Sequence, residues 1–61
     1  MRYSVELRQY SEDGDDYSEE HYGFETKEET IAFASKNGNQ VHSVLDYGSG
    51  GKTYNPKYIN I

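Results

Sequence analysis

The chain has 61 residues, a net charge of −5 at pH 7 and no cysteine. This length suits a single domain over residues 1–61 that buries only about 60 % of its unfolded surface. The absence of cysteine excludes disulfides and thiolate metal sites. An acidic chain also lacks the basic patches that direct binding to DNA or RNA requires.

Tyrosine supplies much of the apolar surface, because the chain has seven tyrosines and two phenylalanines. Tyrosine is enriched at protein interfaces, and oligomerisation can stabilise a small domain without disulfides. We therefore expect a homodimer. No apolar run is long enough for a membrane span, and the N-terminus lacks the pattern of a signal peptide. We expect a cytoplasmic protein.

The first half of the chain has the pattern of a β-hairpin. Apolar and polar residues alternate from Tyr3 to Tyr10, which predicts a half-buried strand. The Asp13-Gly14 pair predicts the turn, because glycine adopts a positive φ without a steric clash. The return strand is expected over Tyr17–Phe24. Its alternation places Glu20, Tyr22 and Phe24 on one face and Glu19, His21 and Gly23 on the other.

A helix is predicted over Lys27–Asn37. Thr26 and Glu29 form a capping box, in which the Thr26 hydroxyl accepts from the Glu29 amide and the Glu29 carboxylate reaches back to the Thr26 amide. Gly38 is expected to end the helix in the left-handed conformation. The face turned toward the sheet is expected to consist of Thr30, Ile31, Phe33, Ala34 and Asn37.

Two further strands are predicted after the helix, over Gln40–Tyr47 and Lys52–Ile61, with a turn at Gly48–Gly51 between them. Pro56 places the last strand at a sheet edge or makes it irregular. The expected fold is therefore α+β, in the order ββαββ, with one helix across a small antiparallel sheet. In the third strand, alternation puts Val41, Leu45 and Tyr47 on one face and His42, Val44 and Asp46 on the other.

The motifs that suggest catalysis or ligand binding are incomplete. The glycine-rich segment before Lys52 has Asp46 where a phosphate loop needs its first glycine. The acids after Asp13 do not form a calcium loop, because Tyr17 occupies the third ligand position. His21 and His42 have no evident nucleophile as a partner. We therefore expect a protein that is not an enzyme and has neither cofactor nor metal.

The strongest signal is the acidic stretch from Ser11 to Glu29, which holds nine carboxylates and one lysine for a net charge of −8. Such blocks are usually disordered, but here aromatic residues and a helix start lie among the acids. We interpret the stretch as a folded acidic face. Same-side residues of a strand lie about 6.5–7 Å apart, a spacing close to that of phosphates along one nucleic-acid strand. A row of carboxylates with this spacing would fit a protein groove that binds DNA.

We expect the carboxylates of this face to replace phosphates and the aromatic side chains to act as buried anchors. The residues predicted to bind the partner are Glu12, Asp13, Asp15, Asp16, Tyr17, Glu19, Glu20, Tyr22 and Phe33.

The first half of the chain resembles the small dimeric uracil-DNA glycosylase inhibitors of bacteriophages. The similar residues are Tyr3-x-Val5, Asp13-Gly14 and Tyr17-x-Glu19-x-His21-x-Gly23-Phe24. The resemblance implies that Phe33 of paired helices helps to form an apolar pocket for the side chain that the glycosylase wedges into DNA, and that Glu19 matches an important acid. The chain departs from that family at Asn37, where the family has tyrosine, and after Tyr47.

The segment from Phe24 to Gly38 is also similar to small uncharacterised ββαβ domains of bacteria and phages, and this similarity carries little functional information. The function we expect is non-catalytic inhibition of a DNA-binding enzyme, with uracil-DNA glycosylase as the first candidate. The alternatives are an anti-CRISPR or anti-restriction inhibitor of a nuclease, and a generic protein-interaction module without mimicry. In either form of inhibition, the partner would be a basic DNA-binding groove of a host enzyme.

Overall fold

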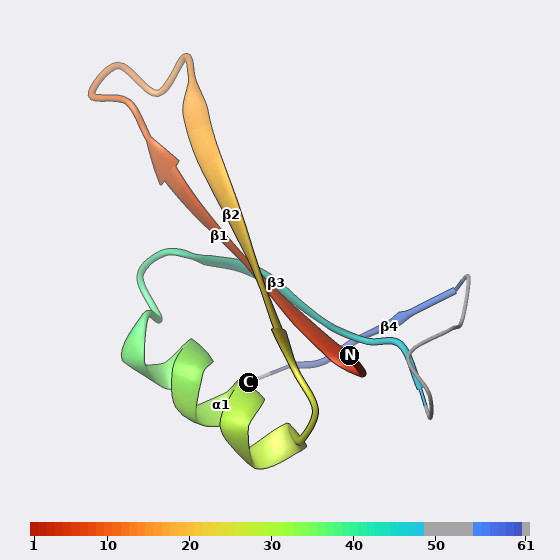
Figure 1. Cartoon of the computed structure of the whole chain (residues 1–61). Helices are drawn as coiled ribbons and strands as arrows, with labels where there is room; N and C mark the ends of the chain where they lie inside the picture. The colour runs from red at the N-terminus through yellow and green to blue at the C-terminus, as the bar shows by residue number, and fades with distance from the viewer. Residues whose placement is uncertain (49–54, 61) are drawn as a thin grey trace.

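The computed structural model describes residues 1–48 and 55–60, in which four antiparallel strands and one helix follow the order ββαββ (Figure 1). The sheet has the strand order β2-β1-β3-β4, and the helix contacts β1 and β2. The predicted α+β fold is therefore confirmed. The elements are β1 (Tyr3–Tyr10), β2 (Tyr17–Phe24), α1 (Lys27–Lys36), β3 (Val41–Asp46) and β4 (Lys57–Tyr58).

The β1–β2 hairpin has the predicted bounds in both strands. Its register runs without interruption from the pair Tyr3 and Phe24 to the pair Tyr10 and Tyr17. Gly14 in the turn has a φ of +77°, as the Asp-Gly signal predicts. The hairpin is therefore a regular two-stranded ladder, and its faces follow directly from the alternation of residues.

The helix begins at the predicted N-cap. The Glu29 amide donates to the Thr26 hydroxyl oxygen over 3.2 Å, which confirms the first half of the capping box. The second half differs from the prediction, because the Glu29 carboxylate accepts from the Thr26 hydroxyl at 2.9 Å and not from the Thr26 amide. The cap still ties the first turn of α1 to the end of the hairpin.

The predicted left-handed glycine cap at the end of α1 is wrong. Among the described residues, only Gly14 and Gly48 have a positive φ, so Gly38 is not left-handed. Asn37 caps the helix in its place, because its side-chain amide donates to the Phe33 carbonyl over 3.0 Å. The same carbonyl also accepts from the Asn37 backbone amide at 3.2 Å, so both bonds close the last turn of α1.

The core lies between α1 and one face of the sheet, here called the helix face; the opposite side is called the open face. The buried residues of the core cluster are Val5, Leu7, Ala34 and Val44, with Phe24, Phe33, Val41 and Ile59 packed against them. Ile31 was predicted on the buried side of α1 but is 37 % exposed. Ile31 is one residue from the buried Thr30, a rotation of about 100° around the helix, which carries its side chain to the border of the packed face.

A β-bulge in β3 changes the faces predicted for that strand. Glu6 pairs with Ser43, but the next residue, Leu7, pairs with Val41, so that His42 is the extra residue. Val41 therefore lies on the helix face together with Val44, and not on the opposite face as strict alternation predicted. The bulge lets both valines contribute to a small core.

The last strand is shorter than predicted. Within the described residues, β4 covers only Lys57 and Tyr58, which pair with Asp46 and Leu45. Asn55, Pro56 and Ile59 lie outside the strand, and Pro56 has no amide hydrogen to donate to a ladder. β4 is a sheet edge, as predicted from Pro56. The predicted turn after Gly48 and the predicted strand residues 52–54 and 61 lie outside the described residues.

The packing of Val5 provides a test of this core. Val5 is a fully buried residue of β1, so we expect Val5→Ala to lower the free energy of unfolding by about 2 kcal/mol through lost burial and a cavity. Ile31→Ala removes more atoms from the border of the packed face, and we expect a cost below about 1 kcal/mol. Urea denaturation monitored by circular dichroism measures both. Equal losses would contradict the described core.

Candidate functional site

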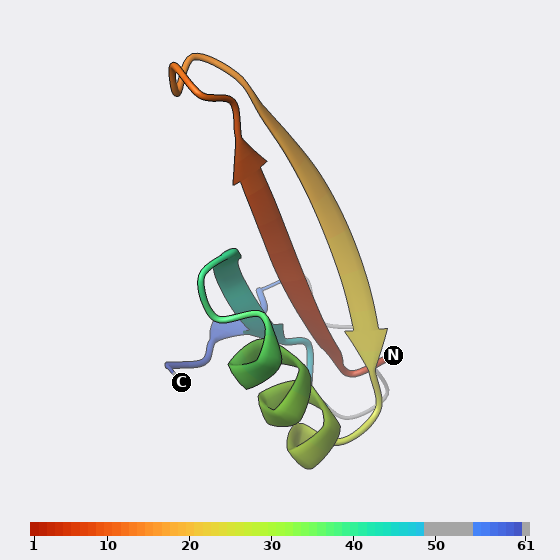
Figure 2. The ribbon, with the colours of Figure 1, turned by 90° about the vertical axis from the view of Figure 1, so that its left-hand side faces the viewer.

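The β1–β2 hairpin extends well beyond the helix and β3, and its turn forms one end of the molecule (Figure 2). We call β1, β2 and the connecting turn Ser11–Asp16 the acidic hairpin, and the connecting segment the acidic turn. Every residue from Gln9 to Gly23 is exposed. The carboxylates of this region are therefore presented to solvent on a two-stranded arm and do not lie flat against the core.

Hydrogen bonds within the acidic turn hold its backbone. The Ser11 amide donates to the Asp16 carbonyl over 2.8 Å, and the Gly14 amide donates to the Ser11 carbonyl over 3.0 Å. The Asp13 carboxylate accepts from the Ser11 hydroxyl at 2.6 Å and from the Asp15 amide at 3.2 Å. These bonds, the Ser11 hydroxyl first, lower the pKa of Asp13 below its ordinary value. The turn is thus an ordered segment in which at least one acid is fixed by the loop itself.

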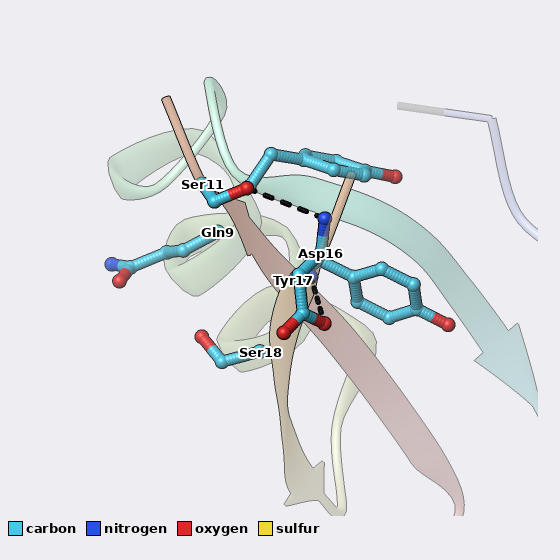
Figure 3. A pocket seen from close by; sticks show the side chains of 6 residues that line it. Gln9, Ser11, Asp16, Tyr17 and Ser18 are labelled. Atoms are coloured by element: carbon cyan, nitrogen blue, oxygen red, sulfur yellow. Dashed lines mark hydrogen bonds between the residues drawn. The ribbon is translucent and has the colours of Figure 1, made fainter. Parts of the chain in front are cut away.

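The base of the acidic turn encloses a shallow depression of about 350 Å³, lined by residues of both strands (Figure 3). There the Asp16 amide donates to the Ser11 hydroxyl oxygen, and the Tyr17 amide donates to the Asp16 carboxylate at 2.8 Å. Gln9 and Ser18 line the same depression. The Ser11 hydroxyl and the Asp16 carboxylate are engaged in holding the turn, so we interpret the depression as a structural part of the hairpin.

Tyr17 forms an aromatic platform next to the acidic turn. Its ring lies 5.4 Å from the ring of Tyr10, its cross-strand partner, and the Arg8 guanidinium lies 4.5 Å from its centre. Tyr17 is nonetheless 46 % exposed. A supported but exposed aromatic ring can bury area against a partner at a small cost in conformational entropy.

The two acids of β2 lie on opposite faces of the sheet. Leu7 is a core residue and pairs with Glu20, so Glu20 is on the helix face, whereas Glu19 pairs with Arg8 on the open face. β2 therefore has no two carboxylates at positions i and i+2, and the expected row with phosphate-like spacing does not form along this strand. The acids surround the end of the hairpin instead.

The open face carries a charge network around Arg8. The Arg8 Nε lies 2.6 Å from Glu6 and 3.9 Å from Glu19, and His21 Nε2 lies 4.0 Å from Glu19. The hydrogen bond from Arg8 lowers the pKa of Glu6 and raises the pKa of Arg8.

A potential metal ligand from each of Glu6, Glu19 and His21 lies within 4.8 Å of the other two. The guanidinium of Arg8 already bridges the two carboxylates. Because that cation supplies the charge a metal would bring, we interpret the group as an ion-pair network that joins β1 to β2.

Tyr22 and Phe33 differ in their availability as anchors. The Tyr22 hydroxyl donates to the Glu20 carboxylate, which raises the pKa of Tyr22. The Phe33 ring lies 4.8 Å from Tyr22 and 5.1 Å from Phe24, and it packs against the core cluster. Tyr22 remains 38 % exposed, whereas Phe33 is half-buried and serves the helix–sheet contact. Phe33 could reach a partner only over its exposed part.

The predicted binding residues thus fall into two groups. The first is grouped at the end of the hairpin and contains Glu12, Asp13, Asp15, Asp16 and Tyr17. The second lies on the two faces of β2 and beneath it, with Glu19 on the open face and Glu20, Tyr22 and Phe33 on the helix side. The sequence prediction missed Arg8 and Tyr10 as residues of the site. The pairing of β1 with β2, which places Arg8 opposite Glu19 and Tyr10 opposite Tyr17, could have identified them.

Comparison of the chain with protein-family models, with curated proteins and with solved structures found no match. No comparison therefore tests the resemblance to the glycosylase inhibitors, and the function that it implies is a proposal. In the part of the chain that the structure describes, no helix has the length and apolar character needed to cross a membrane.

The Glu6–Arg8 pair predicts a specific acid sensitivity. The lowered pKa means that folded Glu6 binds protons less readily than unfolded Glu6, whose ordinary value is 4.5. The stability from this pair is therefore complete above that pH and is lost as the pH falls through the lowered value. We expect the melting temperature of the parent to exceed that of Glu6→Gln at pH 7, and the difference to shrink toward pH 3. A difference that does not change with pH would contradict the pair.

Proposed function

We propose that the chain is a non-catalytic inhibitor that inserts its acidic hairpin into a basic, DNA-binding groove of an enzyme. The observation that carries this proposal is the projecting turn, in which Glu12, Asp13, Asp15 and Asp16 are exposed on a hydrogen-bonded backbone. Because the acidic turn is already ordered, it does not have to fold when it enters a groove. This reduces the conformational entropy that binding costs.

The electrostatics support a basic partner. The six acids from Glu12 to Glu20 have only Arg8 as a nearby cation among the described contacts, and Arg8 lies beside Glu6 and Glu19 and not in the turn. The turn therefore carries a concentrated negative charge that accelerates encounter with a positive groove and excludes nucleic acid as a direct ligand. Because the acids surround the end of the hairpin, we propose mimicry by a compact cluster and not by a linear row.

The platform of Tyr10 and Tyr17 supplies the contact area that charges alone do not provide. Tyr17 lies directly after the last acid of the turn, and its ring is supported by Tyr10 and Arg8. A groove that accepts the turn would also meet this ring. Uracil-DNA glycosylase is the first target to test because of the resemblance in β1 and β2, and CRISPR and restriction nucleases are the next.

A pair of variants tests the proposal. Glu12→Gln with Asp15→Asn removes two charges from the turn, whose side chains carry no described bond that holds the loop. Glu25→Gln with Glu28→Gln removes two charges near the start of α1 and is the matched control. We expect the turn variant to inhibit the target at least about tenfold less strongly, equivalent to about 1.4 kcal/mol, and the control to match the parent.

The assay is uracil excision from DNA with and without the protein, followed by nuclease cleavage assays if excision is unaffected. Inhibition should weaken with added salt and with competing DNA. If the parent inhibits and the turn variant inhibits equally well, the acidic turn is not the binding surface. Binding to a partner without competition from DNA would favour a generic interaction module over mimicry.

We also propose that the protein is a homodimer, as expected from its size and tyrosine content. The predicted mass is twice the 7.0 kDa of one chain, measured by sedimentation at micromolar concentration in 0.15 M salt. Because Phe33 is half-buried and Ile31 is exposed on α1, Ile31→Glu tests whether paired helices form the contact. A monomeric parent would contradict the proposal.

A further inference from the structure

The second strand forms one complete edge of the sheet. The strand order places β2 outermost, next to β1, while the other edge is the two-residue β4 (Figure 2). β2 has eight residues, no proline and no bulge in its register with β1, and all of its residues but Phe24 are exposed. It is therefore a long and regular edge with an open hydrogen-bonding side.

The register identifies which backbone groups point outward. The Ser11 amide bonds to the Asp16 carbonyl, and the Arg2 amide bonds to the Phe24 carbonyl, so the even-numbered residues of β2 direct their backbone groups to β1. The odd-numbered residues then direct theirs to the free edge. Glu19 and His21, near the middle of the strand, therefore have their backbone groups on the free edge. These groups are open to a further strand.

The charged side chains of β2 determine which kind of strand can bind to this edge. Long edges are normally protected by proline, lysine, bulges or short length, and β2 has none of these devices. Its protection is Glu19 on the open face and Glu20 on the helix face. A second copy of the chain would bring its own acids close to Glu19 and Glu20. Such pairing is unfavourable because like charges on neighbouring strands repel. A strand with basic residues on both faces would be attracted.

We propose that β2 receives an extended, basic segment of the partner protein as an additional antiparallel or parallel strand. The inference rests on the proposed function, because it assigns a binding mode to the same acidic hairpin. Main-chain hydrogen bonds to Glu19 and His21 would supply affinity, and two adjacent basic residues next to Glu19 and Glu20 would supply specificity. The ligand class is thus a basic β-strand of a protein.

The test uses a nine-residue peptide of alternating valine and threonine with a central lysine–arginine pair, titrated into the full chain labelled with ¹⁵N. We expect the Glu19 and His21 amides to shift and to become protected from hydrogen exchange. His21→Pro removes one outward amide that has no described bond within the protein, and His21→Ala keeps that amide but lacks the imidazole. We expect a loss of affinity of at least tenfold for His21→Pro and parent-like affinity for His21→Ala.

A peptide of the same sequence that is methylated on every backbone amide keeps the test decisive if His21→Pro does not fold. It keeps the side chains but has no amide hydrogen to donate to β2, so it should not bind. Equal binding of the two peptides, or no binding of the unmethylated peptide, would overturn strand addition. The proposed function would then still be judged separately by DNA competition and the turn variants. A doubled mass that His21→Pro reduces to one chain would assign the edge to a second copy and would also overturn the inference.

Discussion

The uninterrupted pairing of β1 with β2 is the constraint on which the rest of the structure depends. In this register Val5 pairs with Tyr22 and Leu7 pairs with Glu20, and Val5 and Leu7 face the helix. Because side chains alternate along a strand, Glu6 and Arg8 then lie on the open face. The same register sets Arg8 opposite Glu19 and Tyr10 opposite Tyr17. A slip of one residue would reverse both faces and dismantle the core and the charge network together.

The acids of the hairpin lie at a distance from the hydrophobic core, which stabilises the fold. The core is small, with only five buried hydrophobic residues among those described, and lies between the helix and the helix face of β1 and β3. The acids gather at the far end, where water screens their mutual repulsion. Arg8 and the hydroxyl of Ser11 bind Glu6 and Asp13 at short range. The separation lets a marginally stable domain present a concentrated negative surface.

Local sequence signals predicted most of the fold, and tertiary contacts explain the differences. Alternation gave both bounds of β1 and β2, and Thr26 with Glu29 gave the start of α1. The bulge at His42 had no sequence signal, because it depends on how β3 meets β1 near Leu7. Asn37 replaced Gly38 as the cap since its own side chain reaches the Phe33 carbonyl. For the candidate site, composition identified the acids and alternation placed Glu19 and Glu20 on opposite faces. Only the register shows that Glu20 is on the helix face and that Glu19 lies opposite Arg8.

We infer that its own hydrogen bonds hold the acidic turn in one conformation in the free protein. Backbone ¹⁵N relaxation of residues 11–16 tests it most directly, because order parameters distinguish a fixed loop from a mobile one. We expect order parameters near those of the rigid strands, about 0.85, with the Ser11 and Gly14 amides protected from exchange. Values below about 0.6 throughout the turn would show that no fixed arrangement of carboxylates exists for a partner to recognise.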